Sequence, residues 1–183
     1  MNVVIITGYG DRDDYIKLAT KRWPKRFGSN PLIFKFGWSG EAASYDKKWQ
    51  KFSDTIKDFD KVAIIGISAG ASVALRAMQT YPDKVTHVIT ISGPVQLEKM
   101  GRKTLREKFP VLLRSLDKLS LEGLPAKRVL TLRAAFDEVA NIHAMIIIGA
   151  TNIQMKIIGH LISIVWGLFH HAKDIHDFIR RPV

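Results

Sequence analysis

The segment from Lys61 to Gly70, KVAIIGISAG, constrains the fold more than any other part of the chain. Its apolar run Val62–Ile65 is typical of a buried β-strand, and the small residues that follow Ser68 begin a helical pattern. A serine at a sharp turn from strand to helix lies in strained backbone, so the residues two positions before and after it are crowded together. Gly66 and Gly70 meet that requirement. The pattern predicts a strand, a tight turn with Ser68 at its tip, and a helix packed against the strand.

Ser68 is the candidate nucleophile at this turn. The helix that starts after it points unsatisfied backbone N–H groups and a positive dipole end toward the place where negative charge would form on an attacked substrate. The backbone N–H of Ala69 is therefore one candidate donor to an oxyanion. The second candidate is the N–H of Tyr9, in the glycine-containing loop after the first predicted strand. A plain strand-to-helix turn is the alternative explanation of that loop.

Strand-like and helix-like segments alternate along the chain, which indicates an α/β fold with a mostly parallel sheet. Six strands are predicted, at Val3–Thr7, Leu32–Phe36, Val62–Ile67, Val85–Ile91, Arg128–Leu132 and Gln154–Ile158. Helices are predicted at Tyr15–Phe27, Tyr45–Phe59, Ala69–Tyr81, Lys103–Leu119 and Ile162–Arg180. Asp137–Gly149 fits either a buried helical turn or a short strand. We therefore expect a three-layer α/β/α sandwich around one six-stranded sheet.

Length and composition bound the class of protein. With 183 residues and 46% hydrophobic residues, the chain is expected to form a single domain over residues 1–183. It has no cysteine, which excludes a disulfide framework, a thiolate zinc site and a cysteine nucleophile. No metal and no cofactor are predicted. The first predicted strand begins at once, without the basic and apolar regions of a signal peptide, so we expect a cytoplasmic location.

The net charge of +11 suggests an anionic partner, and Lys21–Arg26, KRWPKR, is a basic hexamer that contains a tryptophan. Most other basic residues are scattered over predicted helix exteriors, which favours a solvated basic surface. The longest uncharged stretch, Ile157–Ala172, is shorter than the roughly 20 apolar residues that span a bilayer, and its apolar positions follow a helical stripe. We expect no specific nucleic-acid partner and no transmembrane segment. The oligomeric state is left open.

Ligands of a parallel sheet gather beyond the carboxyl ends of its strands, so the residues that directly follow each strand are the candidates for a site. A serine nucleophile needs a base within hydrogen-bond reach, and a carboxylate to hold that base. His160 follows the last predicted strand and precedes the last helix, whereas the other five histidines are expected to be structural or solvent-facing. Asp137, after the fifth strand, is the candidate acid. Its neighbour Glu138 is the alternative.

These residues carry a family resemblance. The order Ser68, Asp137, His160, the Gly-x-Ser-x-Gly turn and the glycine-containing first loop resemble the α/β-hydrolase family over nearly the whole chain. The resemblance implies hydrolysis of an ester, thioester or amide through an acyl-enzyme. The first loop reads TGYG where many members have a histidine before the glycine, and Ala134 stands where a glycine often precedes the acid. The chain starts at the strand that carries the oxyanion loop, so we expect a small member trimmed of the family's first two strands.

The segment Pro94–Lys127, where family members carry a cap domain, has room for little more than one helix. We therefore expect at most a short cap-like segment and an open pocket, with wall residues Gly8, Gly10, Trp38, Pro94, Val95 and Met100. The expected function is that of a carboxylesterase-like serine hydrolase, acting on small-molecule esters with short acyl chains. A thioesterase, a peptidase and a non-catalytic binding protein on the same scaffold are the alternatives.

Overall fold

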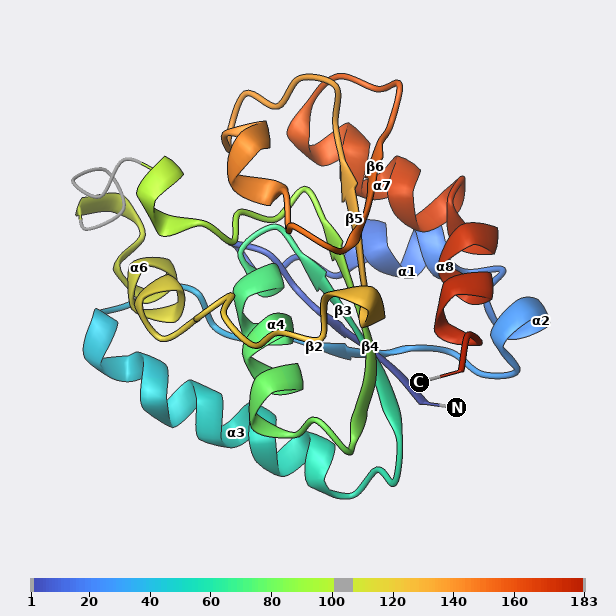
Figure 1. Ribbon diagram of the computed structural model, residues 1–183, viewed down its shortest axis with the longest axis horizontal. Helices are drawn as coiled ribbons and strands as arrows, with labels where there is room; N and C mark the ends of the chain where they lie inside the picture. Colours follow the sequence, from blue (N-terminus) through green and yellow to red (C-terminus); the bar gives the residue numbers. More distant parts are fainter. Residues whose placement is uncertain (1, 101–106, 183) are drawn as a thin grey trace.

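The computed structural model describes residues 2–100 and 107–182 (Figure 1). Its centre is one sheet of six parallel strands in the order β2-β1-β3-β4-β5-β6. The strands are β1 (Asn2–Ile6), β2 (Leu32–Phe34), β3 (Val62–Ile67), β4 (Val85–Ile91), β5 (Val129–Arg133) and β6 (Thr151–Gln154). The predicted α/β fold with a six-stranded sheet is confirmed.

Helices cover both faces of the sheet and complete a three-layer sandwich, as Figure 1 shows. One face is covered by α3 (Tyr45–Lys57), α4 (Gly70–Thr80) and α6 (Pro110–Asp117). The other face is covered by α1 (Asp14–Thr20), α7 (His160–Phe169) and α8 (Ala172–Ile179), with the short α2 (Pro24–Phe27) after α1. Short 3₁₀ turns lie at Ala42–Ser44, Leu97–Lys99, Ala126–Arg128 and Ile142–Met145.

Two hydrophobic cores hold the layers together, one on each face of the sheet. Alternate residues of one strand point to opposite faces, so Ile64 of β3 packs with Phe52 and Leu75 while Ile65 packs with Leu168. All six residues of β3 are buried, as expected for a central strand covered on both faces. The turn that follows β3 therefore starts from a strand that is buried on both faces.

The predicted helix Tyr15–Phe27 is wrong as a single element, because the structure divides it into α1 and α2. Pro24 has no N–H to donate and its ring clashes with a preceding helical carbonyl, so a helix cannot run through it. The indole Nε1 of Trp23 donates a hydrogen bond to the Leu168 carbonyl at 3.1 Å, which links the segment between α1 and α2 to α7.

The last predicted helix also divides, into α7 and α8, with a turn at His170 and His171. That turn lets Ile175 and Phe178 of α8 pack into the core against β4. The last strand was predicted too late: β6 ends at Gln154, where the prediction began.

The segment that could be helix or strand, Asp137–Gly149, is a loop that contains the 3₁₀ turn Ile142–Met145. Residues 101–106 of the cap-like segment Pro94–Lys127, and with them residues 103–106 of the predicted helix Lys103–Leu119, lie outside the described residues. In the described part, that segment contains one helix of more than one turn, α6, between two 3₁₀ turns.

Candidate active site

The turn between β3 and α4 places Ser68 at its tip with a φ of 49°, in the left-handed region that non-glycine residues rarely adopt. The Ser68 N–H donates to the Ile91 carbonyl at 2.9 Å, and its own carbonyl accepts from Ala71 N–H at 3.0 Å. A Cβ on Gly66 would come within 2.5 Å of the Gly70 carbonyl oxygen. A Cβ on Gly70 would come within 2.6 Å of a carbonyl oxygen of β1. Both glycines are therefore required by close backbone contacts.

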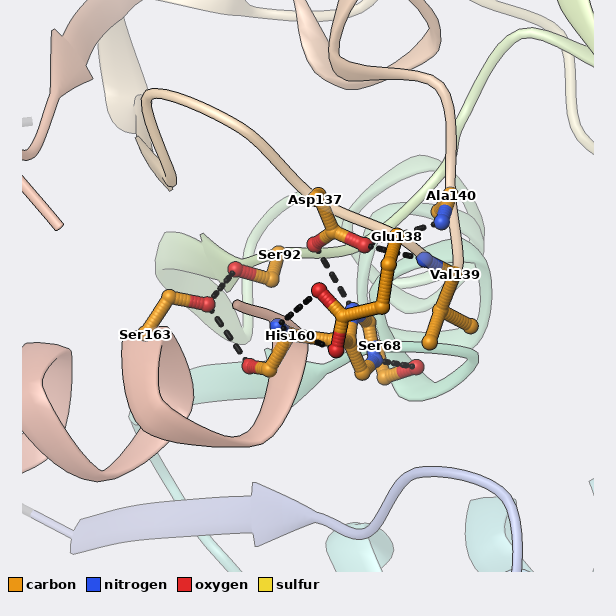
Figure 2. A network of polar contacts seen from close by, with 8 residues as sticks. All are labelled: Ser68, Ser92, Asp137, Glu138, Val139, Ala140, His160 and Ser163. Atoms are coloured by element: carbon orange, nitrogen blue, oxygen red, sulfur yellow. Dashed lines mark hydrogen bonds and ion pairs between the residues drawn. The ribbon is translucent and has the colours of Figure 1, made fainter. Parts of the chain in front are cut away.

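Three side chains from separate segments of the chain meet beyond the carboxyl ends of β3, β5 and β6 (Figure 2). His160 Nε2 lies 2.9 Å from Ser68 Oγ, and His160 Nδ1 lies 2.7 Å from Asp137 Oδ2. His160 is the first residue of α7, and Asp137 lies in the loop after β5. The structure thus brings Ser68, His160 and Asp137 together in one hydrogen-bonded chain.

Asp137 is held in its charged form by its surroundings. Burial by itself would raise the pKa of this carboxyl, since its side chain has no exposed surface. The hydrogen bond from His160, and those from the Ala140 and Val139 N–H groups at 2.9 Å each, outweigh burial and lower the pKa below its usual value. The carboxylate is therefore ionised at neutral pH and orients the imidazole.

Glu138, the alternative acid, contacts a different part of His160. Its two carboxylate oxygens accept from the backbone N–H of His160 at 3.1 and 3.0 Å, not from the imidazole ring. On the opposite side, Ser163 Oγ donates to the His160 carbonyl at 2.7 Å and lies 2.5 Å from Ser92 Oγ, as Figure 2 shows. Glu138 and Ser163 are therefore positioning residues for the start of α7.

The two predicted oxyanion donors, Tyr9 and Ala69, both line the pocket beside Ser68. Neither backbone N–H donates to an acceptor among the described residues. Gly8 packs directly on the serine, because a Cβ there would come within 2.9 Å of Ser68 Cβ. The first loop therefore packs directly against Ser68, and only glycine fits at position 8.

Asp11 braces this first loop, a role that sequence analysis missed. Its carboxylate accepts from Thr7 Oγ1 at 2.6 Å and from the N–H groups of Gly37 and Trp38 at 3.1 Å each. These bonds tie the loop after β1 to the loop after β2. The signal in the sequence was weak, since Asp11 is one of three acids around the start of α1 and resembles an ordinary first-turn residue.

The assignment of Trp38 to the pocket wall is wrong. The side chain is 1% exposed and lies in the core, where its Nε1 donates to the Thr7 carbonyl at 2.8 Å. An indole is placed inside when its N–H finds an acceptor, and the Thr7 carbonyl supplies one. Val95 is also buried, and the pocket is lined by none of Val95, Gly8 and Gly10.

A pocket of about 250 Å³ opens at Ser68. Pro94 and Met100 line it, together with Tyr9 and Ala69. Sequence analysis missed the remaining wall residues, which are Lys99, Phe109, Leu112, Val139, Ala140 and Asn141. They come from two loops and from α6, and their approach to Ser68 depends on how the chain turns between elements. The only hint in the sequence was the apolar run around Pro110.

Other site types are not supported by the described residues. Within residues 2–100 and 107–182, no three His, Asp or Glu side chains are grouped so that they could hold a metal ion. In the same part of the chain, no helix has both the length and the apolar character needed to cross a membrane.

Sequence comparison with protein-family profiles and with curated proteins gives no match. Comparison with solved structures finds proteins of similar architecture. A hydrolase from Oleispira antarctica aligns with a TM-score of 0.70 and 13% identity, over 98% of this chain and 91% of that one. The mouse α/β hydrolase domain-containing protein 10 aligns with a TM-score of 0.68 and 18% identity, over 96% and 89%.

A monoacylglycerol lipase from Paleococcus ferrophilus aligns with a TM-score of 0.65 and 15% identity, over 97% of this chain and 93% of that one. At these identities the likeness establishes the architecture of the chain. The sheet order, the strained serine turn and these structural neighbours agree: this chain has the α/β-hydrolase fold.

Proposed function

We propose that this protein is a serine hydrolase that cleaves small carboxylic esters through an acyl-enzyme. The observation that carries the proposal is the hydrogen-bonded chain from Ser68 Oγ through His160 to the buried Asp137 carboxylate, at 2.9 and 2.7 Å. A serine hydroxyl is a weak nucleophile at neutral pH, and such an arrangement supplies both the base that activates it and the carboxylate that fixes the base.

In the acylation step, Ser68 Oγ attacks the ester carbonyl carbon while His160 Nε2 takes the hydroxyl proton. The carbonyl oxygen becomes an oxyanion, which the N–H groups of Tyr9 and Ala69 stabilise from fixed positions. Collapse of the tetrahedral intermediate breaks the bond to the alcohol, and His160 returns the proton to the departing oxygen. The product is an ester of Ser68 with the acyl group of the substrate.

In the deacylation step, a water molecule takes the place of the alcohol. His160 Nε2 removes a proton from the water as its oxygen attacks the acyl carbon, and the same N–H groups stabilise the second oxyanion. Ser68 then leaves with the proton carried by His160, and the carboxylic acid is released. Asp137 stays ionised throughout and stabilises the imidazolium that forms twice in each cycle.

The structural neighbours support hydrolysis as the general reaction class. The names of two of them are a hydrolase and a monoacylglycerol lipase. The same machinery transfers acyl groups from esters, thioesters and amides, so a thioesterase or a peptidase uses the same three residues. A carboxylesterase-like preference and a cytoplasmic location stay predictions.

A substrate panel tests the proposal and separates the alternatives. The purified chain should hydrolyse p-nitrophenyl acetate or butyrate faster than the matching acyl thioesters and aminopeptide substrates. Faster turnover of the thioester would identify the protein as a thioesterase, and faster turnover of the aminopeptide substrate would identify it as a peptidase. A chain that neither turns over any of the three nor reacts with a fluorophosphonate probe would be a binding protein on a hydrolase scaffold.

A further inference from the structure

The outer side of α7 is apolar and exposed to solvent. Leu161, Ile162, Trp166 and Phe169 are 48%, 58%, 39% and 57% exposed, respectively. The inner side of the same helix, which includes Ile164 and Leu168, fills the core. A helix on the surface of a globular protein has charged or polar residues on its outer side, whereas α7 carries no Asp, Glu, Lys or Arg over its whole length.

The apolar surface continues onto the neighbouring helix. Leu18 of α1 is 72% exposed, and it lines a surface hollow together with Val165 and Phe169 of α7. We refer to Leu18, Leu161, Ile162, Trp166 and Phe169 as the apolar face. Single exposed apolar residues are common, but a contiguous set over two packed helices marks a binding surface.

Four cationic side chains border the apolar face at the end near Phe169. Lys21, Arg22, Lys25 and Arg26, the basic cluster, lie in and around α2, and three of them line a hollow that also contains Phe169. Among the described residues, no carboxylate forms an ion pair with any of the four.

The carboxylates on the neighbouring helices already have partners. Asp13 pairs with Lys17 and Lys35, and Asp14 pairs with Arg12. Asp177 of α8 pairs with Lys173, and the Asp174 carboxylate lies in hydrogen-bond contact with His171 Nδ1 at 2.7 Å. The positive charge of the basic cluster is therefore not neutralised by these neighbours.

We propose that the apolar face and the basic cluster together dock the protein on a membrane surface that carries anionic lipid headgroups. Peripheral helices bind such surfaces by burying Trp, Phe and Leu side chains at the boundary of headgroup and acyl chain while Lys and Arg contact the headgroups. Trp166 is of the residue type that favours this boundary.

Charge decides between a membrane and a second copy of the chain as the occupant. Two copies would each bring a net charge of +11, and long-range repulsion would oppose their approach. An anionic lipid surface complements both the apolar face and the basic cluster. The docking surface does not include Ser68 or the pocket residues, so the inference stands apart from the proposed reaction.

Co-sedimentation with vesicles tests the inference. The full chain should bind vesicles of phosphatidylcholine and phosphatidylserine mixed in equal parts, and bind vesicles of phosphatidylcholine alone much more weakly. Arg22→Gln with Lys25→Gln should lower the partition coefficient about 30-fold, since each cation near such a surface contributes about fivefold. Trp166→Gln with Phe169→Gln should lower it at least about tenfold by removing the buried apolar area.

Matched controls separate docking from general attraction. Lys47→Gln with Lys51→Gln removes two exposed charges from α3, on the opposite face of the sheet, and should leave the partition within about twofold. Ile148→Gln removes an apolar side chain that is 93% exposed elsewhere, and should also have little effect. Ester hydrolysis, or circular dichroism if no substrate is turned over, verifies that each variant is folded.

Three results would overturn the inference. The first is no binding to the mixed vesicles. The second is an equal loss of binding in the Lys47 and Lys51 variant, which would show that total charge alone drives adsorption. The third is a dimer in sedimentation velocity that Phe169→Gln dissociates, which would assign the apolar face to a second copy of the chain.

Discussion

At the residue scale, His160 is held from four directions. Asp137 and Ser68 contact its two ring nitrogens, Glu138 accepts from its backbone N–H, and Ser163 donates to its carbonyl. A base whose ring and backbone are both fixed needs little rearrangement before proton transfer, which lowers the entropic cost of reaching the reactive geometry. Asp137, which contacts the imidazole ring, and Glu138, which contacts the backbone N–H, therefore have different roles.

Substitution of the two acids separates these roles. Asp137→Asn keeps the shape of the side chain but presents an amide to Nδ1, which favours the wrong imidazole tautomer and should lower kcat roughly 10⁴-fold. Glu138→Gln keeps an oxygen acceptor for the His160 backbone N–H and should lower kcat by less than about tenfold. Steady-state kinetics on a p-nitrophenyl ester measures both. A severe loss of kcat in Glu138→Gln, together with a mild loss in Asp137→Asn, would show that Glu138 and not Asp137 is the acid of the site.

His87 gives a second prediction, on stability. It is 2% exposed in β4, its Nδ1 has no hydrogen-bond partner in the described structure, and its ring contacts Phe178 edge-on. Burial, with the nearby Arg128 and Arg181, lowers the pKa of His87 from 6.5 to about 4. The unfolded chain therefore takes up a proton below pH 6.5 that the folded chain does not. This costs stability as pH falls from 6.5 toward 4, by ~2–3 kcal/mol in total.

Urea unfolding at a series of pH values measures this dependence. In His87→Gln, the free energy of unfolding should fall less steeply than in the natural chain as pH drops from 6.5 to about 4. The comparison of slopes is valid even where the variant is less stable overall. Parallel curves for the two proteins would show that His87 is protonated in the folded state, contrary to the structure.

At the element scale, the central strands were predictable because their signals are local. The bounds of β3 follow from a continuous apolar run and those of β4 from a run of mostly β-branched residues, and the strain at Ser68 follows from the glycines on either side. Pro24 divides a helix that its apolar periodicity suggested was continuous. The edge strand β6 was misplaced because its exposure alternates and it lacks such a run.

The site was predictable for a similar reason, and only in part. Ser68, Asp137 and His160 come within about six residues after the ends of β3, β5 and β6, so the topology of a parallel sheet brings them to one edge. Side chains such as Trp38 and Phe109 lie on long connections, where no local sequence pattern indicates whether a side chain points into the core or toward the pocket. Trp38 points into the core toward the Thr7 carbonyl, and Phe109 lines the pocket with an edge-on contact to Tyr9.

The serine turn makes a prediction about packing between elements. In Gly66→Ala the added methyl group would lie 2.5 Å from backbone atoms of Gly70 and Ala71, which cannot move without shifting α4. We expect a loss of stability of about 3 kcal/mol, at the upper end of the usual cost of overpacking, and a loss of activity. Thermal unfolding and ester turnover measure the two effects.

Gly123→Ala is the matched control. Gly123 has a φ of 70° and open space around its Cα, so this change costs only the backbone strain of about 1 kcal/mol. Equal destabilisation by the two substitutions would show that close approach of α4 to β3 is not what selects glycine at position 66.

At the scale of the whole molecule, the pocket limits the substrate. Its volume of about 250 Å³ lies below the roughly 300–1,000 Å³ of sites that enclose drug-sized ligands. A long acyl chain would leave most of its methylene groups in water, where they contribute no binding energy to the transition state. Docking of the apolar face on a membrane does not enlarge this pocket.

A chain-length series of p-nitrophenyl esters measures this limit. We expect kcat/KM to be highest for acyl groups of about two to six carbons and to flatten or fall beyond them. No jump in rate is expected at the solubility limit of the substrate. A steep rise out to about twelve carbons would contradict the prediction and reveal an acyl-binding surface outside the pocket.

Loss of one oxygen atom from Ser68 tests its assignment as the nucleophile. Ser68→Ala removes the Oγ that lies 2.9 Å from His160 Nε2 and leaves the backbone of the turn in place. Turnover of a p-nitrophenyl ester should fall about 10⁴- to 10⁶-fold, and labelling by a fluorophosphonate probe should disappear, while the circular dichroism spectrum is unchanged. A folded Ser68→Ala protein that keeps more than about a tenth of the rate, or that is still labelled, would contradict the assignment of Ser68 as the nucleophile.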